Sequence, residues 1–156
     1  MTTNVLKEDA SPHADIMLET LRSIGYLFET AVADIIDNSI AALATRITIQ
    51  SNWNGESSTL AIIDNGKGMM LAELREAMRL GSRHPNLERS EQDLGRFGLG
   101  LKTASFSQCR RFTVLSKTNE TQVNFRCWDL DFIANADPKG WFVLEDLSAE
   151  EMAVTL

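Results

Sequence analysis

The feature that constrains this chain most is an apolar helical pattern over residues 26–44 that is interrupted by polar side chains. Apolar residues recur there at three- and four-residue steps, which places them on one face of a helix: Phe28, Ala31, Val32, Ile35, Ile36, Ile40 and Leu43. Asp34 and Asn38 are one turn apart, so they stack at the margin of that face. Both residue types disfavour helix interiors, because their side chains compete for backbone groups. They are explained either by a solvated helix edge or by a cleft, where a carboxylate orients water and a carboxamide holds a cation.

Composition narrows the class of protein. A length of 156 residues suits one domain, and 44% apolar residues suit a globular core. The net charge of −7 repels phosphates, which argues against direct nucleic-acid binding. Cys109 and Cys127 lack metal-binding spacing and are expected to be free thiols. We find no signal peptide and no stretch long enough to span a membrane, and we expect a cytoplasmic protein with no membrane partner.

The rest of the chain predicts alternating helices and strands in a single domain, after a flexible lead-in over residues 1–12. The expected helices are residues 13–23, 26–44, 71–80 and 101–107, with another beginning at 149–155. The expected strands are residues 46–52, 59–64, 111–116, 121–130 and 140–146. The polar segment over residues 81–97 has no periodicity and predicts a lid. This order predicts a two-layer α/β sandwich, with helices on one face of a mixed, mainly antiparallel sheet.

A short polar segment, Asp64-Asn65-Gly66-Lys67-Gly68-Met69, follows the second predicted strand. An Asp at the end of a buried strand can accept a hydrogen bond from an exocyclic amine such as that of adenine. Gly66 and Gly68 permit positive φ and let a flat ring approach closely, and Met69 can pack against that ring. The alternative is a simple turn between a strand and a helix.

A glycine-rich segment opens the fourth predicted helix. Exposed N–H groups at such a helix start bind phosphate, aided by the helix dipole. Its G-x-x-G-x-G spacing differs from both the Rossmann and the Walker A patterns. The alternatives are a glycine hinge for the lid and, for the lysine, a solvated helix position. The candidate phosphate-binding residues are Gly95, Arg96, Phe97, Gly98, Leu99, Gly100, Leu101, Lys102 and Thr103.

These three segments, in this order, resemble the GHKL ATPase superfamily of DNA gyrase B, heat-shock chaperone ATPases, histidine kinases and MutL. Residues 95–105 are most similar to MORC-type ATPases and their bacterial relatives. The resemblance covers roughly residues 20–130 and implies a Bergerat-type fold that binds ATP and Mg²⁺. By position, Asp34 falls on the general base, Asn38 on the Mg²⁺ ligand, and Asp64 on the adenine-reading aspartate. Gly66, Gly68 and Met69 fall around the ring, and the glycine-rich segment falls on the triphosphate site.

Three departures from the family pattern qualify what the resemblance implies. Asp34 stands where the family usually has Glu, and it is one methylene shorter, so its reach to an attacking water is reduced. Ala41 stands where relatives often have an acidic residue. Gly140-Trp141-Phe142 does not match the Gly-Thr strand that completes the site in many relatives. We therefore expect the N-terminal part of a longer protein, in which a further domain supplies a γ-phosphate contact.

These observations leave three functions open. The first is a Mg²⁺-dependent, slowly hydrolysing ATPase module whose nucleotide state controls lid closure and homodimerisation. The second is an ATP-binding switch with little or no hydrolysis, which the shorter Asp34 keeps open. The third is a histidine-kinase catalytic domain, which is disfavoured because no phospho-acceptor helix precedes it.

Overall fold

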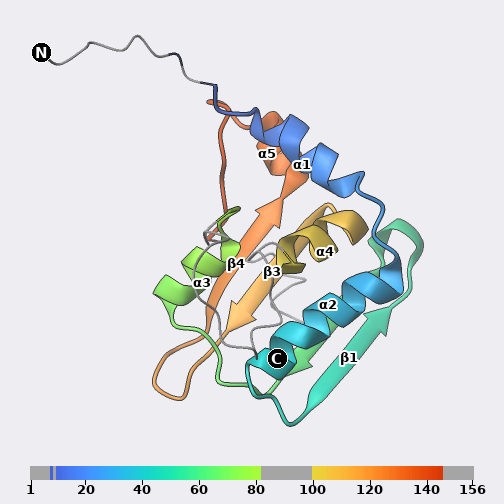
Figure 1. Cartoon of the computed structure of the whole chain (residues 1–156), viewed down its shortest axis with the longest axis vertical. Coiled ribbons are helices and arrows are strands. Elements are labelled where there is room, and N and C mark those ends of the chain that lie inside the picture. The colour runs from blue at the N-terminus through green and yellow to red at the C-terminus, as the bar shows by residue number, and fades with distance from the viewer. Residues whose placement is uncertain (1–7, 9, 82–99, 146–156) are drawn as a thin grey trace, which may run out of the picture.

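The computed structural model describes residue 8, residues 10–81 and residues 100–145 (Figure 1). Most of the segment predicted as a lid and the helix predicted at residues 149–155 lie outside these ranges. The described elements are, in chain order, α1 (Ala14–Arg22), α2 (Phe28–Ala41), β1 (Ile47–Asn52), the 3₁₀ turn η1 (Gly55–Ser57), β2 (Thr59–Asp64), α3 (Leu71–Met78), α4 (Gly100–Gln108), β3 (Arg111–Ser116), β4 (Asn124–Asp129) and α5 (Leu130–Asn135). The predicted α/β class with antiparallel strands is confirmed.

The described strands form two two-stranded antiparallel sheets, where the sequence pattern predicted a single sheet. In the first hairpin β1 pairs with β2, with Ile47 opposite Asp64 and Asn52 opposite Thr59. In the second hairpin β3 pairs with β4. The prediction of a strand over residues 140–146 is wrong for residues 140–145, which the structure describes. These residues contribute one isolated β-bridge, between Leu144 and Cys127.

The buried core lies where α1, α3, α4 and α5 meet the β3–β4 hairpin. Phe106 of α4 is fully buried and contacts Trp128 and Phe112 edge-on, with ring centroids 5.6 Å and 5.1 Å away. Edge-to-face pairs of this kind add to the stabilisation from apolar burial. Helix α2 packs along α4 and contacts β2, so it joins the first hairpin to the core (Figure 1).

The C-terminal end of α3 is tied to two other elements by buried hydrogen bonds. The Lys102 ammonium of α4 donates to the Ala77 carbonyl over 2.6 Å, and the Trp128 indole of β4 donates to the Met78 carbonyl over 3.0 Å. The last carbonyls of a helix lack partners within the helix and carry partial negative charge. Both donors are almost completely buried, so these contacts fix α3 against α4 and β4 inside the core.

Helix α2 ends three residues before the sequence pattern predicted. Ala44 N donates to Ser39 O and Leu43 N donates to Ile40 O, the paired bonds of a Schellman motif. Leu43 has φ +62°, a left-handed conformation that glycine usually supplies. Because no glycine marks this end, the apolar periodicity carried the prediction through to Ala44.

Helix α5 was missed, because the strand predicted over residues 121–130 extended through its start. The Asp129 side chain accepts a hydrogen bond from Phe132 N over 2.9 Å and thereby caps α5. At the other end, the Thr121 hydroxyl bonds to Thr118 within a turn, so β4 begins only at Asn124. An Asp followed three residues later by an apolar residue was the signal for this helix start.

The segment after β2 passes close to two other parts of the chain at its glycines. At Gly66, an added Cβ would lie 2.8 Å from Ala42 Cβ and from Ala42 O. At Gly68, where φ is +68°, it would lie 1.9 Å from the Lys117 carbonyl oxygen in the β3–β4 turn. Met69 N continues this contact by donating to the Ser116 hydroxyl over 2.7 Å. The segment therefore joins the two hairpins, and Gly68 is the residue that permits the closest approach.

We predict that Gly68→Ala lowers the free energy of unfolding by roughly 3 kcal/mol or more, because a left-handed alanine and a forced displacement of the β3–β4 turn both cost energy. Gly55→Ala is the matched control, since Gly55 also has positive φ but has no neighbour within 4 Å of an added Cβ. That variant should lose only about 1 kcal/mol. Urea unfolding of both variants measures the difference, and equal losses would contradict the close approach at Gly68.

Candidate functional site

The Asp34 carboxylate is held by a tyrosine from outside its helix. Tyr26 lies between α1 and α2, and its hydroxyl donates to Asp34 Oδ2 over 2.7 Å. Both side chains are half-buried. The apolar helical pattern placed Tyr26 inside the helix, and no role was predicted for it. Because Tyr26 precedes the first residue of α2, helical spacing does not predict its contact with Asp34.

Asn38 lies one turn after Asp34, as the helical spacing predicted. Its amide Nδ2 donates to the Asp34 main-chain oxygen over 2.8 Å, and the side chain is exposed. The amide oxygen, the atom that a cation would bind, takes no part in this contact. The described residues contain no cluster of three His, Cys, Asp or Glu side chains that would hold a metal by itself. An exposed carboxamide oxygen fits Mg²⁺, which binds few protein oxygens together with nucleotide phosphates.

Asp64 is fixed at the end of β2 through both of its carboxylate oxygens. The hydroxyl of Ser39 on α2 donates to Oδ2 over 2.9 Å, and Gly66 N donates to Oδ1 over 2.8 Å. Ser39 is 4% exposed, so α2 approaches β2 closely at this point. A carboxylate has acceptor sites beyond these two, and Asp64 is exposed, so it can still accept from a ligand amine.

Ser39 was not identified as a site residue from the sequence, although its signal was present. It is a polar residue directly after Asn38, and it falls on the buried side of α2. A buried hydroxyl needs a partner, and Asp64 supplies it. This hydrogen bond brings together two of the three sequence segments that the site was expected to contain.

The structure places Gly66, Gly68 and Met69 against the chain itself. Gly66 and Gly68 make the close backbone approaches described above. Lys67 N, between them, donates to the Ala42 carbonyl over 2.9 Å. The half-buried Met69 packs against the hydrophobic core. Their contact with a flat ring stays a prediction, whereas their role in joining α2, β2 and the β3–β4 turn is a described feature.

The glycine-rich segment is described only where it enters α4. Gly100, Leu101, Lys102 and Thr103 form the first turn of that helix, and the predicted site residues Gly95, Arg96, Phe97, Gly98 and Leu99 lie outside the described ranges. Lys102 is 1% exposed and donates to Ala77 O at the end of α3. It is therefore a buried packing lysine in this structure, and contact with a phosphate would require it to leave that position.

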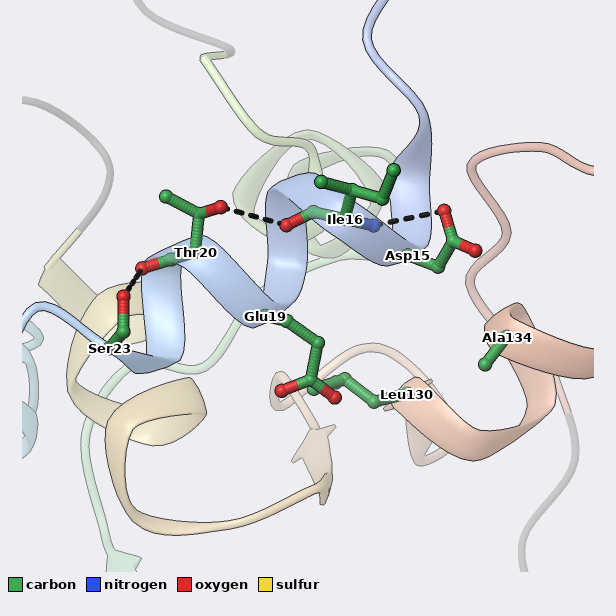
Figure 2. A pocket seen from close by; sticks show the side chains of 7 residues that line it. All are labelled: Asp15, Ile16, Glu19, Thr20, Ser23, Leu130 and Ala134. Carbon is green, nitrogen blue, oxygen red and sulfur yellow. Dashed lines mark hydrogen bonds between the residues drawn. The ribbon is translucent and has the colours of Figure 1, made fainter.

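A surface groove of about 560 Å³ lies between α1 and α5, away from the residues predicted for the site (Figure 2). Figure 2 shows that three of its polar side chains bond to neighbouring turns of the chain: Asp15 accepts from Ile16 N, Thr20 donates to Ile16 O, and Ser23 donates to Thr20 O. Glu19, which also lines the groove, pairs with Arg110. Ligand sites are concave and present convergent polar groups. Because these polar groups bond to the chain itself, we do not assign this groove the function.

A second groove, of about 300 Å³, follows the β1–β2 hairpin and reaches the end of β2. Its lining residues are Arg46, Thr48, Gln50, Ile63, Asp64 and Asn65. Asn65 is bonded to the loop between α2 and β1, because its Oδ1 accepts from Thr45 N and from Arg46 N. Asp64 is the residue of this groove that also belongs to the predicted site.

Other sequence expectations concern the surface and the cysteines. Arg110 pairs with Asp131 and Glu19, and Arg111 pairs with Asp129, so these adjacent arginines do not form a basic patch.

Cys109 and Cys127 are free thiols, as predicted. Burial raises the pKa of the Cys109 thiol to about 11, which makes it a poor nucleophile at neutral pH. Within the described ranges, every helix is too short or too polar to cross a membrane.

Comparisons with known proteins identify the family of this chain. A family model described as "Histidine kinase-, DNA gyrase B-, and HSP90-like ATPase" matches residues 26–154, and the chain belongs to that family. The chain is also similar to Protein MICRORCHIDIA 5 of Arabidopsis thaliana, with 37% identity over 82 residues, which are 48% of this chain and 11% of the relative. The chain thus spans about a tenth of the length of the curated relative that it matches. The predicted GHKL membership and likeness to MORC-type proteins are confirmed, and the family supports an ATP-binding and ATP-hydrolysing module as the general class of function.

We predict a pH dependence from the Tyr26–Asp34 contact. The hydrogen bond that Tyr26 donates to Asp34, together with the partial burial of Tyr26, raises the pKa of the Tyr26 hydroxyl above 10.0, although the Thr103 side chain opposes the shift. Because the folded pKa is the higher one, the stabilisation is complete below pH 10.0 and is lost as pH rises through the folded pKa.

Tyr26 is the only tyrosine, so the ultraviolet absorbance of tyrosinate follows this one group. Asp34→Asn should move the midpoint down toward 10.0, whereas Asp37→Asn on the exposed side of α2 should not move it. Circular dichroism in the same titration identifies the pH range in which the chain stays folded. A midpoint that is unchanged in Asp34→Asn would show that the two side chains do not interact in solution.

Proposed function

We propose that this domain binds Mg²⁺–ATP and hydrolyses it slowly, and that the nucleotide state controls closure of the segment over residues 81–97 and pairing of two copies. Family membership supports the general activity. The observation that carries the assignment to particular residues is the Ser39–Asp64–Gly66 contact. It presents a fixed carboxylate at the end of β2, next to the helix that carries Asp34 and Asn38.

In this proposal each side chain has one task. Asp64 accepts a hydrogen bond from the adenine amine. Asn38 binds Mg²⁺ through its amide oxygen, and the ion would supply charge neutralisation at the phosphates. Asp34 takes a proton from the attacking water, which requires hydrogen-bond reach to that water. The N-terminal turn of α4, from Gly100 to Thr103, lies at the end of the glycine-rich segment that we assign to the phosphates.

An ATP-binding switch without useful hydrolysis is the second candidate. Asp34 is one methylene shorter than the glutamate of the family, which reduces the reach of the carboxylate toward water. The two candidates share the ATP site and differ only in turnover, so binding and hydrolysis need separate measurements.

For binding, we predict that Asp64→Asn weakens Mg²⁺–ATP by at least about tenfold, because an amide nitrogen replaces one of the acceptor oxygens. The asparagine can keep the local structure, since its oxygen can accept from Gly66 N and its amide can donate to Ser39. Calorimetric titration with a non-hydrolysable ATP analogue measures the effect, with and without Mg²⁺. Asp37→Asn makes the same charge change on the exposed side of α2 and should bind as the wild type does.

Unchanged affinity in Asp64→Asn would contradict the adenine assignment. The absence of binding by the wild type at millimolar nucleotide would contradict the proposed function for this length of chain. The same titration on a longer chain would then show whether a following segment is needed to complete the site.

For hydrolysis, we predict that Asp34→Asn lowers the rate of phosphate release by at least about a hundredfold and leaves ATP binding unchanged, because an amide cannot take the proton from water. Phosphate release under single-turnover conditions measures the chemical step. Asp37→Asn is again the control for loss of a negative charge on α2. Equal and negligible rates in the wild type and in Asp34→Asn, with intact binding, would favour the switch.

A further inference from the structure

Tyr26 is held by α4 as well as by Asp34. Gln108, the last residue of α4, donates through Nε2 to the Tyr26 main-chain oxygen over 3.0 Å. The side chain of Thr103, in the first turn of α4, also acts on the Tyr26 hydroxyl, where it opposes the rise in pKa. Tyr26 therefore connects α4, through its main-chain oxygen, with the Asp34 carboxylate, through its hydroxyl.

The two carboxylate oxygens of Asp34 have different surroundings. The Tyr26 hydroxyl takes Oδ2, which makes Oδ1 the oxygen for an attacking water. A short carboxylate on a half-exposed helix position samples several rotamers, and each fixed rotamer costs side-chain entropy. The strong hydrogen bond from a partly buried phenol selects one of them before any substrate arrives.

We propose that Tyr26 is a positioning residue for the candidate base Asp34, and that it couples the orientation of this carboxylate to the position of α4. The proposal rests on the proposed function, because it assumes that Asp34 takes a proton from water. Thr103 lies three residues after Gly100, at the end of the candidate phosphate-binding segment. A movement of α4 on nucleotide binding would therefore reach Asp34 through a single side chain.

The plain structural alternative is that Tyr26 only attaches the loop between α1 and α2 to α4. That role requires the hydrogen bond from Gln108 to the Tyr26 main-chain oxygen and the packing of the Tyr26 ring. It does not require the hydrogen bond from the Tyr26 hydroxyl to Asp34. The two roles make different predictions for removal of the hydroxyl. A structural role changes stability and ATP affinity together, whereas a positioning role lowers kcat and leaves KM and the affinity for ATP in place.

The test is Tyr26→Phe in the full chain, with kcat, KM and affinity for the ATP analogue measured at a temperature at which the variant is fully folded. We expect kcat to fall about ten- to a hundredfold, because misplacing a catalytic group has effects of this size, with KM and affinity unchanged. Ser23→Ala is the matched control, since it removes a hydroxyl close by in the chain that, among the described residues, bonds to Thr20 O. It should behave as the wild type does.

Two further variants separate the steps of the proposal. Tyr26→Phe made in Asp34→Asn should leave the residual rate unchanged, because a residue that acts through Asp34 has nothing left to position. Gln108→Leu keeps the hydroxyl but removes the hold of α4 on the Tyr26 carbonyl. It should lower kcat by about threefold, the size expected for an indirect coupling.

Several outcomes overturn the inference. They are an unchanged or raised kcat in Tyr26→Phe, a fall in kcat matched by an equal loss of ATP affinity, or the same fall in the Asp34→Asn background. An unchanged Gln108→Leu variant overturns the coupling to α4. If the wild type turns over no faster than Asp34→Asn, the proposed base itself is wrong, and this failure is distinct from a wild type that needs Asp34 but not the Tyr26 hydroxyl.

Discussion

The buried end of α3 is the point on which the rest of the structure depends. The Lys102 ammonium and the Trp128 indole bond there to the Ala77 and Met78 carbonyls. A buried ammonium is costly unless it is hydrogen-bonded, so this arrangement strongly restricts how α4 can lie against α3. Once α4 is placed, it fixes Tyr26 through Gln108, and it packs along α2, which carries Asp34 and Ser39. The positions of Tyr26, Asp34 and Ser39 therefore depend on a contact in the core.

Two hydrogen-bonded positions then define the described part of the site. One is Asp34, which Tyr26 orients from outside α2. The other is Asp64, which Ser39 holds from within α2. Tyr26 bonds to α2 and Ser39 belongs to it. This helix therefore sets the position of Asp34, the proposed water-activating carboxylate, relative to Asp64, the proposed adenine-binding carboxylate. A shift of α2 along its axis would displace both together, so the helix works as one rigid support for two different chemical tasks.

The two-residue period of strands and the 3.6-residue period of helices predicted most of the fold, and local exceptions account for the differences between the predicted and the observed elements. β2 and β3 fall at their predicted residues, because a short apolar stretch ends at a clear turn in both cases. The end of α2 was misplaced because Leu43 takes a conformation typical of glycine. α5 was missed because strand-like residues run directly into its cap, Asp129. For the site, the spacing of Asp34 and Asn38 predicted their shared side of α2. The spacing did not predict the partners of Tyr26 and Ser39, because both side chains bond to residues outside their own element.

The Asp64 carboxylate has a consequence for the thermodynamics of recognition. Both of its oxygens are hydrogen-bonded within the protein, to Ser39 and to Gly66 N. Its rotamer is therefore selected by contacts within the fold, and the entropy of ordering it is lost during folding. A ligand amine that meets this carboxylate encounters a pre-organised acceptor, so more of the hydrogen-bond energy appears as affinity. The entropic cost of ordering Asp64 instead lowers the stability of the end of β2, where Ser39 and Gly66 hold the carboxylate.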